Sequence, residues 1–183
     1  MQDEEAIRRL KHGEIGGLEA LVNRYQVRSL RAAYLVLQDE SLAEDVVQET
    51  FLRVFQRIRF FDEARAFEPY LMRSMVNAAL DAIEKRKHET YFDDKSDEVD
   101  RLIGQAMAVE AQVELGELQE QILAAIACLP ARQRAVVVQR YYLEMSEAEM
   151  ADALDAPAGT IKWLLSVARS RLRSLLKSEG SVE

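Results

Sequence analysis

The stretch that decides the fold is the last third of the chain, where three consecutive helices are predicted. Leu129-Pro130 precedes the first, Ser146-Glu147-Ala148-Glu149 begins the second, and Ala158-Gly159-Thr160-Ile161-Lys162 begins the third. The Ser146 side chain can accept from the Glu149 amide while the Glu149 carboxylate accepts from the Ser146 amide, which fixes a helix start. Asp155-Ala156-Pro157 then ends that helix, because proline donates no amide hydrogen and suits the first turn of the next helix. The sequence therefore predicts a helix-turn-helix.

The last of these helices is basic, although the chain as a whole is acidic. Residues 156–177 include five lysine or arginine residues and no acidic ones, whereas the formal net charge of the chain is -8. A basic helix in the major groove gains affinity from phosphates and can read base edges with its first turns. We therefore favour DNA binding over the alternative of a solvated helix on the surface of a bundle.

The composition indicates a helical protein without catalytic machinery. The 183 residues, 49% of them hydrophobic, suffice for one medium-sized domain or two small ones. Only 7 Gly and 3 Pro occur, and apolar residues recur three and four positions apart, so we predict an all-α fold. A single cysteine, Cys128, and two distant histidines, His12 and His88, form no obvious catalytic or metal-binding set. We predict no enzyme activity, no metal and no cofactor, and a buried Cys128.

The sequence lacks the signals of export and of membrane insertion. No apolar run approaches the roughly 20 residues that cross a bilayer. The chain begins with Met1-Gln2-Asp3-Glu4-Glu5, which is acidic where a secretory signal is basic. We therefore predict a cytoplasmic protein with no direct membrane insertion.

We predict two helical domains joined by an acidic linker. The first spans residues 1–88, with helices over residues 14–37, from a cap at Ser41 to Arg57, and from Pro69 to Lys87. The linker spans residues 89–117, and its residues 89–100 carry six acidic side chains against one lysine. Such a segment resists compaction; it has either a specific role or that of an ordinary solvated linker. The second domain spans residues 118–183 and contains the helix-turn-helix.

Motifs in both predicted domains resemble those of the extracytoplasmic-function (ECF) sigma factors, the smallest class of bacterial RNA polymerase initiation factors. In the first domain the resemblance rests on residues 43–51 (AEDVVQETF), 61–67 (FDEARAF) and 69–71 (PYL), and on Asn77 with Asp81; in the second, on 129–134 (LPARQR) and 159–162 (GTIK). It implies a region 2 and a region 4 that direct core RNA polymerase to promoters, with catalysis left to the polymerase. It also implies contacts with the clamp and flap of the polymerase, and control by an anti-sigma factor.

One polar helix face is assigned to the polymerase. Asp45, Gln48, Glu49 and Leu52 lie at i, i+3, i+4 and i+7, so they share a face while Val47, Phe51 and Val54 turn toward the core. The resemblance implies that this face, polar around an apolar centre, docks on the coiled coil of the clamp. The alternative is a solvated helix face.

A second surface is predicted to bind and open minus 10 DNA, because arginines and aromatic residues interleave there in a way that suits phosphates beside unstacked bases. A flipped base costs a few kcal/mol, which an enclosing pocket must recover, and the resemblance places Asn77 in that pocket. The predicted set is Arg57, Arg59, Phe61, Arg65, Tyr70, Arg73, Asn77, Lys85 and Arg86. Phe61, Phe67 and Tyr70 could equally be core residues. Tyr70 stands where the family usually has Trp, and Glu84 where it often has Arg.

The last helix is predicted to read minus 35 DNA. Its buried stripe consists of Ile161, Leu165, Ala168, Leu172 and Leu175, which leaves the opposite face for DNA. The predicted contacts are Thr160, Lys162, Trp163, Ser166, Arg169 and Arg171. Trp163 packs on a sugar or thymine methyl, or else on the helix-turn-helix core. Leu164 and Val167 replace residues that are often basic in the family.

Two other functions compete with the sigma-factor interpretation. A sigma-like mimic would sequester an anti-sigma factor without binding promoters, and the altered recognition helix is compatible with it. Retention of Asn77 and of the aromatic and basic stretch opposes the mimic, which has no need of strand opening. A helix-turn-helix repressor would require dimerisation for two half-sites, and it leaves residues 45–51 unexplained.

Overall fold

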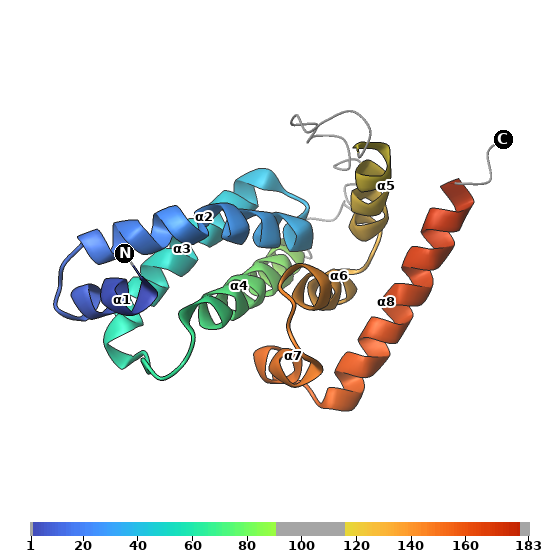
Figure 1. The fold of residues 1–183 in the computed structure, drawn as a ribbon. Helices are drawn as coiled ribbons and strands as arrows, with labels where there is room; N and C mark the ends of the chain where they lie inside the picture. Colours follow the sequence, from blue (N-terminus) through green and yellow to red (C-terminus); the bar gives the residue numbers. More distant parts are fainter. Residues whose placement is uncertain (1, 91–115, 180–183) are drawn as a thin grey trace.

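The computed structural model describes residues 2–90 and 116–179, and all regular secondary structure in these residues is helical. The first bundle contains α1 (Asp3–Lys11), α2 (Gly16–Leu37), α3 (Glu40–Arg57), the short 3-10 helix η1 (Ile58–Phe60) and α4 (Phe67–Thr90). The second group contains α5 (Gly116–Ala127), α6 (Ala131–Val137), the π-helical turn η3 (Val138–Tyr142), α7 (Glu147–Ala153) and α8 (Ala158–Glu179). In Figure 1, α6 lies beside the first bundle and α8 on the outer side.

The predicted all-α fold is confirmed, whereas most of the predicted linker lies outside the described residues. At its two ends α4 continues to Thr90 and α5 begins at Gly116. None of the helices described is both long and apolar enough to cross a membrane.

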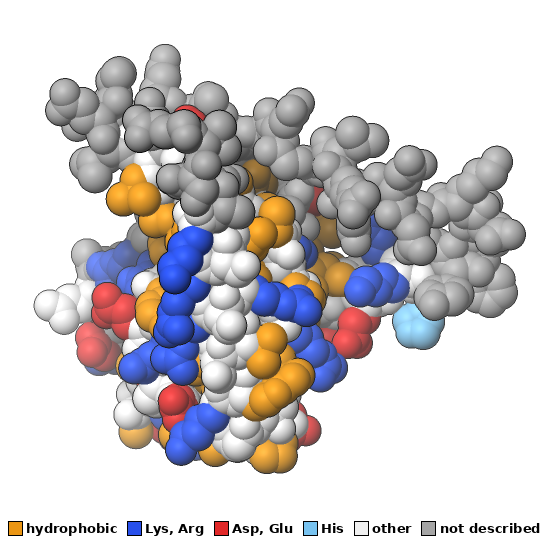
Figure 2. Space-filling model, turned by 90° about the vertical axis from the view of Figure 1, so that its right-hand side faces the viewer, with side chains coloured by type: hydrophobic (Ala, Val, Ile, Leu, Met, Phe, Trp, Pro, Cys, Tyr) orange, Lys and Arg blue, Asp and Glu red, His pale blue; other side chains and the backbone are white. Residues whose placement is uncertain are grey.

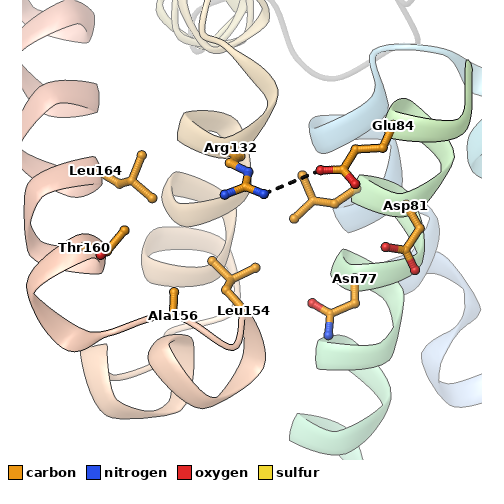
Figure 3. Close-up of a pocket in the computed structure, with 9 residues that line it drawn as sticks. Asn77, Asp81, Glu84, Arg132, Leu154, Ala156, Thr160 and Leu164 are labelled. Atoms are coloured by element: carbon orange, nitrogen blue, oxygen red, sulfur yellow. Dashed lines mark hydrogen bonds and ion pairs between the residues drawn. The ribbon is translucent and has the colours of Figure 1, made fainter. Parts of the chain in front are cut away.

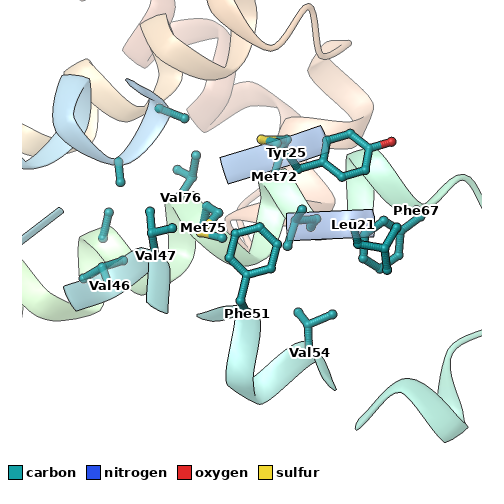
Figure 4. Close-up of a cluster of buried hydrophobic side chains, with 14 of the residues drawn as sticks. Leu21, Tyr25, Val46, Val47, Phe51, Val54, Phe67, Met72, Met75 and Val76 are labelled. Carbon is teal, nitrogen blue, oxygen red and sulfur yellow. The ribbon is translucent and has the colours of Figure 1, made fainter. Parts of the chain in front are cut away.

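The core of the first bundle is built from one apolar stripe on each long helix. Figure 4 shows side chains from α2, α3 and α4 converging on it. The buried α3 side chains are Val46, Val47, Phe51 and Val54; they share an apolar cluster with Leu21 and Tyr25 of α2 and with Met72, Met75 and Val76 of α4. The predicted inward face of α3 is confirmed, and the opposite face is left to solvent.

Two helices of the first bundle begin earlier than the sequence predicts. The N-cap of α3 is Asp39 rather than Ser41: its Oδ1 accepts a hydrogen bond from the Leu42 amide at 3.0 Å. Its Oδ2 accepts one from Arg86 at 3.0 Å. The Leu42 amide, followed by Arg86, holds the pKa of Asp39 below its ordinary value. The fourth helix begins at Phe67, so that Pro69 lies inside its first turn, where a missing amide hydrogen is tolerated.

The first helix, α1, is absent from the sequence prediction. Its buried residues Ala6, Ile7 and Leu10 pack into the core of the first bundle. The approach to α2 is close at Gly17, where a Cβ atom would lie 2.3 Å from the Ala6 carbonyl oxygen. Asp3 accepts hydrogen bonds from Arg24 and from the Tyr25 hydroxyl. Burial, together with the Asp3 carboxylate, raises the pKa of Tyr25.

The helix-turn-helix is confirmed down to its cap. The Glu149 amide donates to Ser146 Oγ at 3.2 Å, and the Ser146 amide donates to Glu149 Oε2 at 2.7 Å. These bonds from Ser146 hold the pKa of Glu149 below its ordinary value. Asp155 adopts a left-handed backbone with φ 46°, and Pro157 immediately precedes α8. Met150, Ile161 and Leu165 then pack α7 and α8 around a second core.

Cys128 is exposed, so the prediction that it is buried is wrong. The reason is that α5 ends at Ala127, and Cys128 falls in the turn that follows. Its neighbours Ile126 and Leu129 are both buried, and Leu129 is only 1% exposed.

The two groups of helices touch through α6. Ala135 and Val138 are buried in the same apolar cluster as the first bundle, and Tyr142 and Leu143 pack against that cluster. The Arg134 guanidinium donates to the Val36 carbonyl oxygen of α2 at 2.8 Å and to the Leu129 carbonyl oxygen at 2.8 Å. This contact places α7 against α4, where two of the predicted DNA-binding residues lie.

Candidate polymerase and nucleic-acid interfaces

The predicted polymerase-binding residues lie together on the solvent side of α3. Asp45, Gln48, Glu49 and Leu52 are all exposed, and 57% of the Leu52 surface is accessible to solvent. The Glu49 carboxylate pairs with Arg53 one turn later at 2.7 Å. An exposed leucine inside a polar helix face is a suitable centre for a protein interface, because apolar atoms gain most from leaving water.

A groove separates this face from the end of α4. Asp45 and Glu49 lie on its α3 side, and Lys85 and Arg86 on its α4 side. Arg86 also pairs with Asp39 at the start of α3. Arg53 of α3 and Asp81 of α4 also line the groove, so each helix contributes both acidic and basic groups to it.

The interleaved arginines and aromatic residues separate into an exposed set and a buried set. Arg57, Arg59 and Arg65 are exposed. Phe61, however, is 8% exposed; its ring centroid lies 5.6 Å from that of Phe67 and 5.0 Å from that of Tyr70. This packing matches the core alternative for Phe61. The aromatic side chain that solvent reaches is Phe60, which is 88% exposed beside Arg59.

Arg73 and Asn77, one turn apart on α4, both contact the carboxyl end of α7. Arg73 pairs with the Asp152 carboxylate through Nη1 and donates from Nη2 to the Asp152 carbonyl oxygen at 2.6 Å. Asn77 Nδ2 donates to the Ala153 carbonyl oxygen at 2.8 Å. Both side chains are half-buried by this contact.

A pocket of about 180 Å³ opens beside Asn77, between α4 and the second group of helices. Figure 3 shows Asn77, Asp81 and Glu84 on one wall and Thr160 and Leu164 on the other, with the Arg132 guanidinium reaching toward Glu84. Arg132 Nη2 and Glu84 Oε1 are 3.5 Å apart. The pocket thus lies between a predicted minus 10 residue and a predicted minus 35 residue.

The outer side of α8 is basic and accessible. Figure 2 shows lysine and arginine side chains running along this side of the molecule. The exposed residues of α8 include Lys162, Trp163, Ser166, Arg169 and Arg173, and Trp163 is 61% exposed. Leu164, by contrast, is 9% exposed and packs in the second core.

Three of the predicted minus 35 residues, although exposed, also face other parts of the chain. Thr160 is exposed but lines the pocket beside Asn77. Lys162 lies 3.9 Å from the Glu147 carboxylate at the start of α7. Arg171 donates to the Gln133 side-chain oxygen at 3.4 Å, which holds α8 on α6.

Two helical groups, the second a capped helix-turn-helix with a basic outer helix, define a helical DNA-binding protein. Residues 21–89 match Sigma-70 region 2, and residues 119–172 match Sigma-70, region 4. The chain belongs to the ECF RNA polymerase sigma factors of the sigma-70 family. It is therefore a sigma factor for promoter recognition by RNA polymerase and not an enzyme.

Relatives that match over most of their length agree with this assignment. The chain is 29% identical over 183 residues to the ECF RNA polymerase sigma factor SigW of Bacillus subtilis (strain 168), covering 97% of this chain and 98% of that protein. It is 30% identical over 169 residues to an RNA polymerase sigma-E factor of Streptomyces avermitilis, covering 92% and 90%.

The fold is shared with two proteins solved in complexes. CnrH, in complex with the cytosolic domain of CnrY, superposes with a TM-score of 0.65 at 22% identity, covering 96% of this chain and 97% of that chain. RpoE from Bartonella quintana, in complex with the anti-sigma factor NepR, gives a TM-score of 0.67 at 22% identity, covering 87% and 98%.

The sequence prediction did not include two residues that the structure brings to these surfaces. Phe60 adjoins Phe61, and the order of residues alone does not say which of the two aromatic rings points inward. Asp152 meets Arg73 across 79 positions of the chain, so no local pattern marks the pair. The one local signal for an accessible aromatic residue is that Phe60 lies between exposed arginines, Arg57 and Arg59 before it and Arg65 after it.

Proposed function

We propose that this sigma factor divides promoter recognition among three surfaces: the outer face of α3 for core polymerase, the η1–α4 region for minus 10 DNA, and the outer face of α8 for minus 35 DNA. The observation that supports the proposal most strongly is the exposed basic side of α8 behind a capped α7. A helix that binds DNA requires exposed basic side chains to neutralise phosphates, whereas a helix that only packs in a bundle does not.

The α3 face binds the polymerase through Asp45, Gln48 and Glu49 around Leu52. Acidic groups on this face attract a basic partner surface and speed the encounter. Burial of Leu52, now 57% exposed, then adds apolar stabilisation at the centre of the contact. The clamp of core RNA polymerase is the partner, with the flap contacted by the second group of helices.

Minus 10 DNA binds to the arginines around η1 and to α4. Arg57, Arg59, Arg65 and Arg73 neutralise phosphates, as do Lys85 and Arg86 farther along α4. Asn77 receives a flipped base through its side-chain amide, which offers both a donor and an acceptor to a base edge. Phe60 takes the stacking role that the sequence assigns to Phe61, because only an accessible ring can meet an unstacked base. Tyr70 supports this surface from the half-buried ring cluster.

Minus 35 DNA binds along α8. Lys162 and Arg169 contact phosphates, Trp163 makes an apolar base contact, and Thr160 and Ser166 supply hydroxyls. Arg171 contributes charge while it also holds α8 on α6. Removal of the Lys162 charge should weaken binding to all DNA sequences alike and lower the salt dependence of the affinity by roughly one unit of slope. Loss of Trp163 should instead relax the base preference at one position of the minus 35 sequence. Binding of Lys162→Ala and Trp163→Ala holoenzymes to a library of minus 35 variants at several salt concentrations separates these outcomes.

An anti-sigma factor is the proposed regulator, and the cytoplasm, where polymerase and promoters meet, the proposed location. Two proteins that share this fold were solved with the cytosolic domain of CnrY and with the anti-sigma factor NepR. A comparable partner would cover the α3 face and lay apolar helix faces against the chain.

Strand opening is tested with Asn77→Ala in the holoenzyme, with Asn23→Ala as the matched control because Asn23 is an exposed amide of α2. A lost pocket hydrogen bond costs on the order of 1 to 3 kcal/mol in the open complex. Permanganate footprinting should show a defect for Asn77→Ala on duplex DNA that a premelted template rescues. Equal defects on both templates would refute the role of Asn77 in opening.

A further inference from the structure

The loop between η1 and α4, residues 61–66, is tied to the carboxyl end of α1. Lys11 Nζ donates to the Phe61 carbonyl oxygen at 2.8 Å and to Glu63 Oε1 at 2.7 Å. The Lys11 side chain is only 23% exposed, although lysine is ordinarily among the most exposed residues. We call these two contacts of Lys11 with Phe61 and Glu63 the Lys11 bridge.

The Lys11 bridge contains a charged pair. The hydrogen bond from Lys11, together with its positive charge, holds the pKa of Glu63 below its ordinary value. Hydrogen bonds between an ammonium and a carboxylate are shorter and stronger than those between neutral groups. The remaining contact, to the Phe61 carbonyl oxygen, supplies a partner for a backbone acceptor at the start of the loop.

The helix that carries Lys11 is itself fixed along its length. At the amino end of α1, Asp3 accepts a hydrogen bond from the Tyr25 hydroxyl of α2. In the middle, Ile7 and Leu10 are buried in the core of the first bundle. Figure 1 shows α1 beside the turn that follows α3, and α1 contacts η1 there. The Lys11 ammonium therefore has a defined position from which to hold the loop.

The bonds inside the loop are local. The Ala64 amide donates to Asp62 Oδ1 at 3.0 Å, and the Arg65 amide donates to the Asp62 carbonyl oxygen at 3.0 Å. These bonds shape a turn of four residues, and both lie within it. The Lys11 bridge ties the middle of this turn, at Glu63, to α1.

Side chains proposed to bind minus 10 DNA lie on both sides of the Lys11 bridge. Phe60, which is 88% exposed, comes directly before it, and Arg65, whose side chain is 78% exposed, follows it. A binding site must hold its side chains within about 0.5 Å of the productive geometry. A shift of the backbone at residues 61–63 would move the exposed ring and the guanidinium relative to one another.

We propose that Lys11 is a positioning residue for minus 10 recognition, which fixes residues 61–66 so that Phe60 and Arg65 meet the melted strand in one geometry. This inference rests on the proposed minus 10 role of the η1–α4 region. Lys11 acts through the backbone of the loop and not on DNA. It also precedes residues 21–89, which match Sigma-70 region 2, so α1 supports the DNA-binding loop from outside the matched segment.

The first experiment measures the loop without DNA, by amide hydrogen exchange of the full chain. The amides of Ala64 and Arg65 report the turn. Lys11→Met keeps the length of the side chain but removes its donors, and it should accelerate their exchange several-fold. Arg8→Met is the matched control: it removes a positive charge from the same helix, where Arg8 pairs with Glu5, and should change nothing. Equal exchange in Lys11→Met and the parent protein would overturn the proposal.

The second experiment measures selectivity in the holoenzyme. One premelted template carries the minus 10 strand that the holoenzyme selects from a randomised pool, and the other carries a scrambled strand of the same composition. General charge effects act equally on both templates, so the ratio of the two affinities reports selective contacts alone. Lys11→Met should lower this ratio about two- to fivefold, the range that a partly exposed ion pair allows. Lys11→Arg, which retains the charge and the donors, should recover most of it. An unchanged ratio in Lys11→Met would overturn the proposal.

Salt dependence separates positioning from a direct phosphate contact by Lys11. A phosphate contact predicts that Lys11→Met weakens binding to both templates alike and lowers the salt dependence by roughly one unit of slope; that result would overturn the proposal. Glu63→Gln tests the other end of the Lys11 bridge. It should lower the selectivity ratio in the parent protein but add nothing in the Lys11→Met background, because the bridge is already broken there. A full additional loss in that background would overturn the bridge.

Failure of the minus 10 role is a separate result. If Phe60→Ala and Arg65→Ala leave the selectivity ratio unchanged, the loop does not read minus 10 DNA, and the positioning role of Lys11 is refuted with it. If these two variants lower the ratio while Lys11→Met does not, the minus 10 role stands and only the inference about Lys11 is refuted.

Discussion

Two adjacent glycines at the start of α2 should respond differently to the same substitution. A Cβ atom on Gly17 would lie 2.3 Å from the Ala6 carbonyl oxygen and 2.9 Å from Leu10 Cγ, whereas one on Gly16 meets nothing within 4 Å. The Ala6 oxygen belongs to the backbone of α1, so the helix as a whole must move. Overpacking of this kind costs about 1–3 kcal/mol. Alanine at an unhindered helical position instead stabilises by up to about 1 kcal/mol.

Urea unfolding of the full chain measures the free energy of unfolding of both variants. Gly17→Ala should lower the free energy of unfolding by about 1–2 kcal/mol once the small gain in helix propensity is subtracted. Gly16→Ala should leave it unchanged or raise it slightly. Complete release of α1 would expose Ile7 and Leu10, at about 1.5–3 kcal/mol each, so a shift of α1 is the cheaper response. Equal stabilities of the two variants would refute the close packing of α1 on α2.

Three further predictions concern the polymerase face of α3, the aromatic pair Phe60 and Phe61, and the cap of α7. Glu49→Lys should leave the stability within about 0.5 kcal/mol of the parent protein yet weaken binding in a core polymerase titration; unchanged affinity would remove this residue from the interface. Phe60→Ala should impair opening of a promoter while leaving thermal stability unchanged, and Phe61→Ala should lower stability by about 3–5 kcal/mol; the reverse pattern would return the stacking role to Phe61. Hydrogen bonds from Ser146 lower the pKa of Glu149, so the carboxylate stabilises the fold above its ordinary pKa of 4.5 and this contribution is lost as the pH falls below that value. Glu149→Gln should therefore reduce the difference in the free energy of unfolding between neutral and acidic solution. An unaltered difference would count against the capping box.

The sequence predicted those helix features that depend only on residues close together in the chain. The reciprocal bonds of Ser146 and Glu149 need only four consecutive residues, and the buried face of α3 follows from the spacing of Val47, Phe51 and Val54. In both cases every atom that decides the structure is near in sequence. The same holds for the break at Pro157.

Features that depend on distant partners could not be predicted in this way. Asp39 and Ser41 are both good cap residues, and Asp39 is additionally bound by Arg86, 47 positions away. The nine-residue helix α1 is acidic in its first turn and basic in its last, a local signal that the sequence prediction missed; a helix this short still depends on packing against α2 for its stability. The contact of Asn77 with Ala153 spans 76 positions, and it arises from the docking of the two groups of helices, which no local pattern encodes.

The most direct test of the account is run-off transcription with purified core RNA polymerase and a template library randomised at the minus 35 and minus 10 positions. We expect transcripts that start from a defined subset of templates and that require this chain. Glu49→Lys and Asn77→Ala should reduce them. Tight binding of an anti-sigma factor without any promoter-dependent transcript would contradict the account and would identify the chain as a sigma-like mimic.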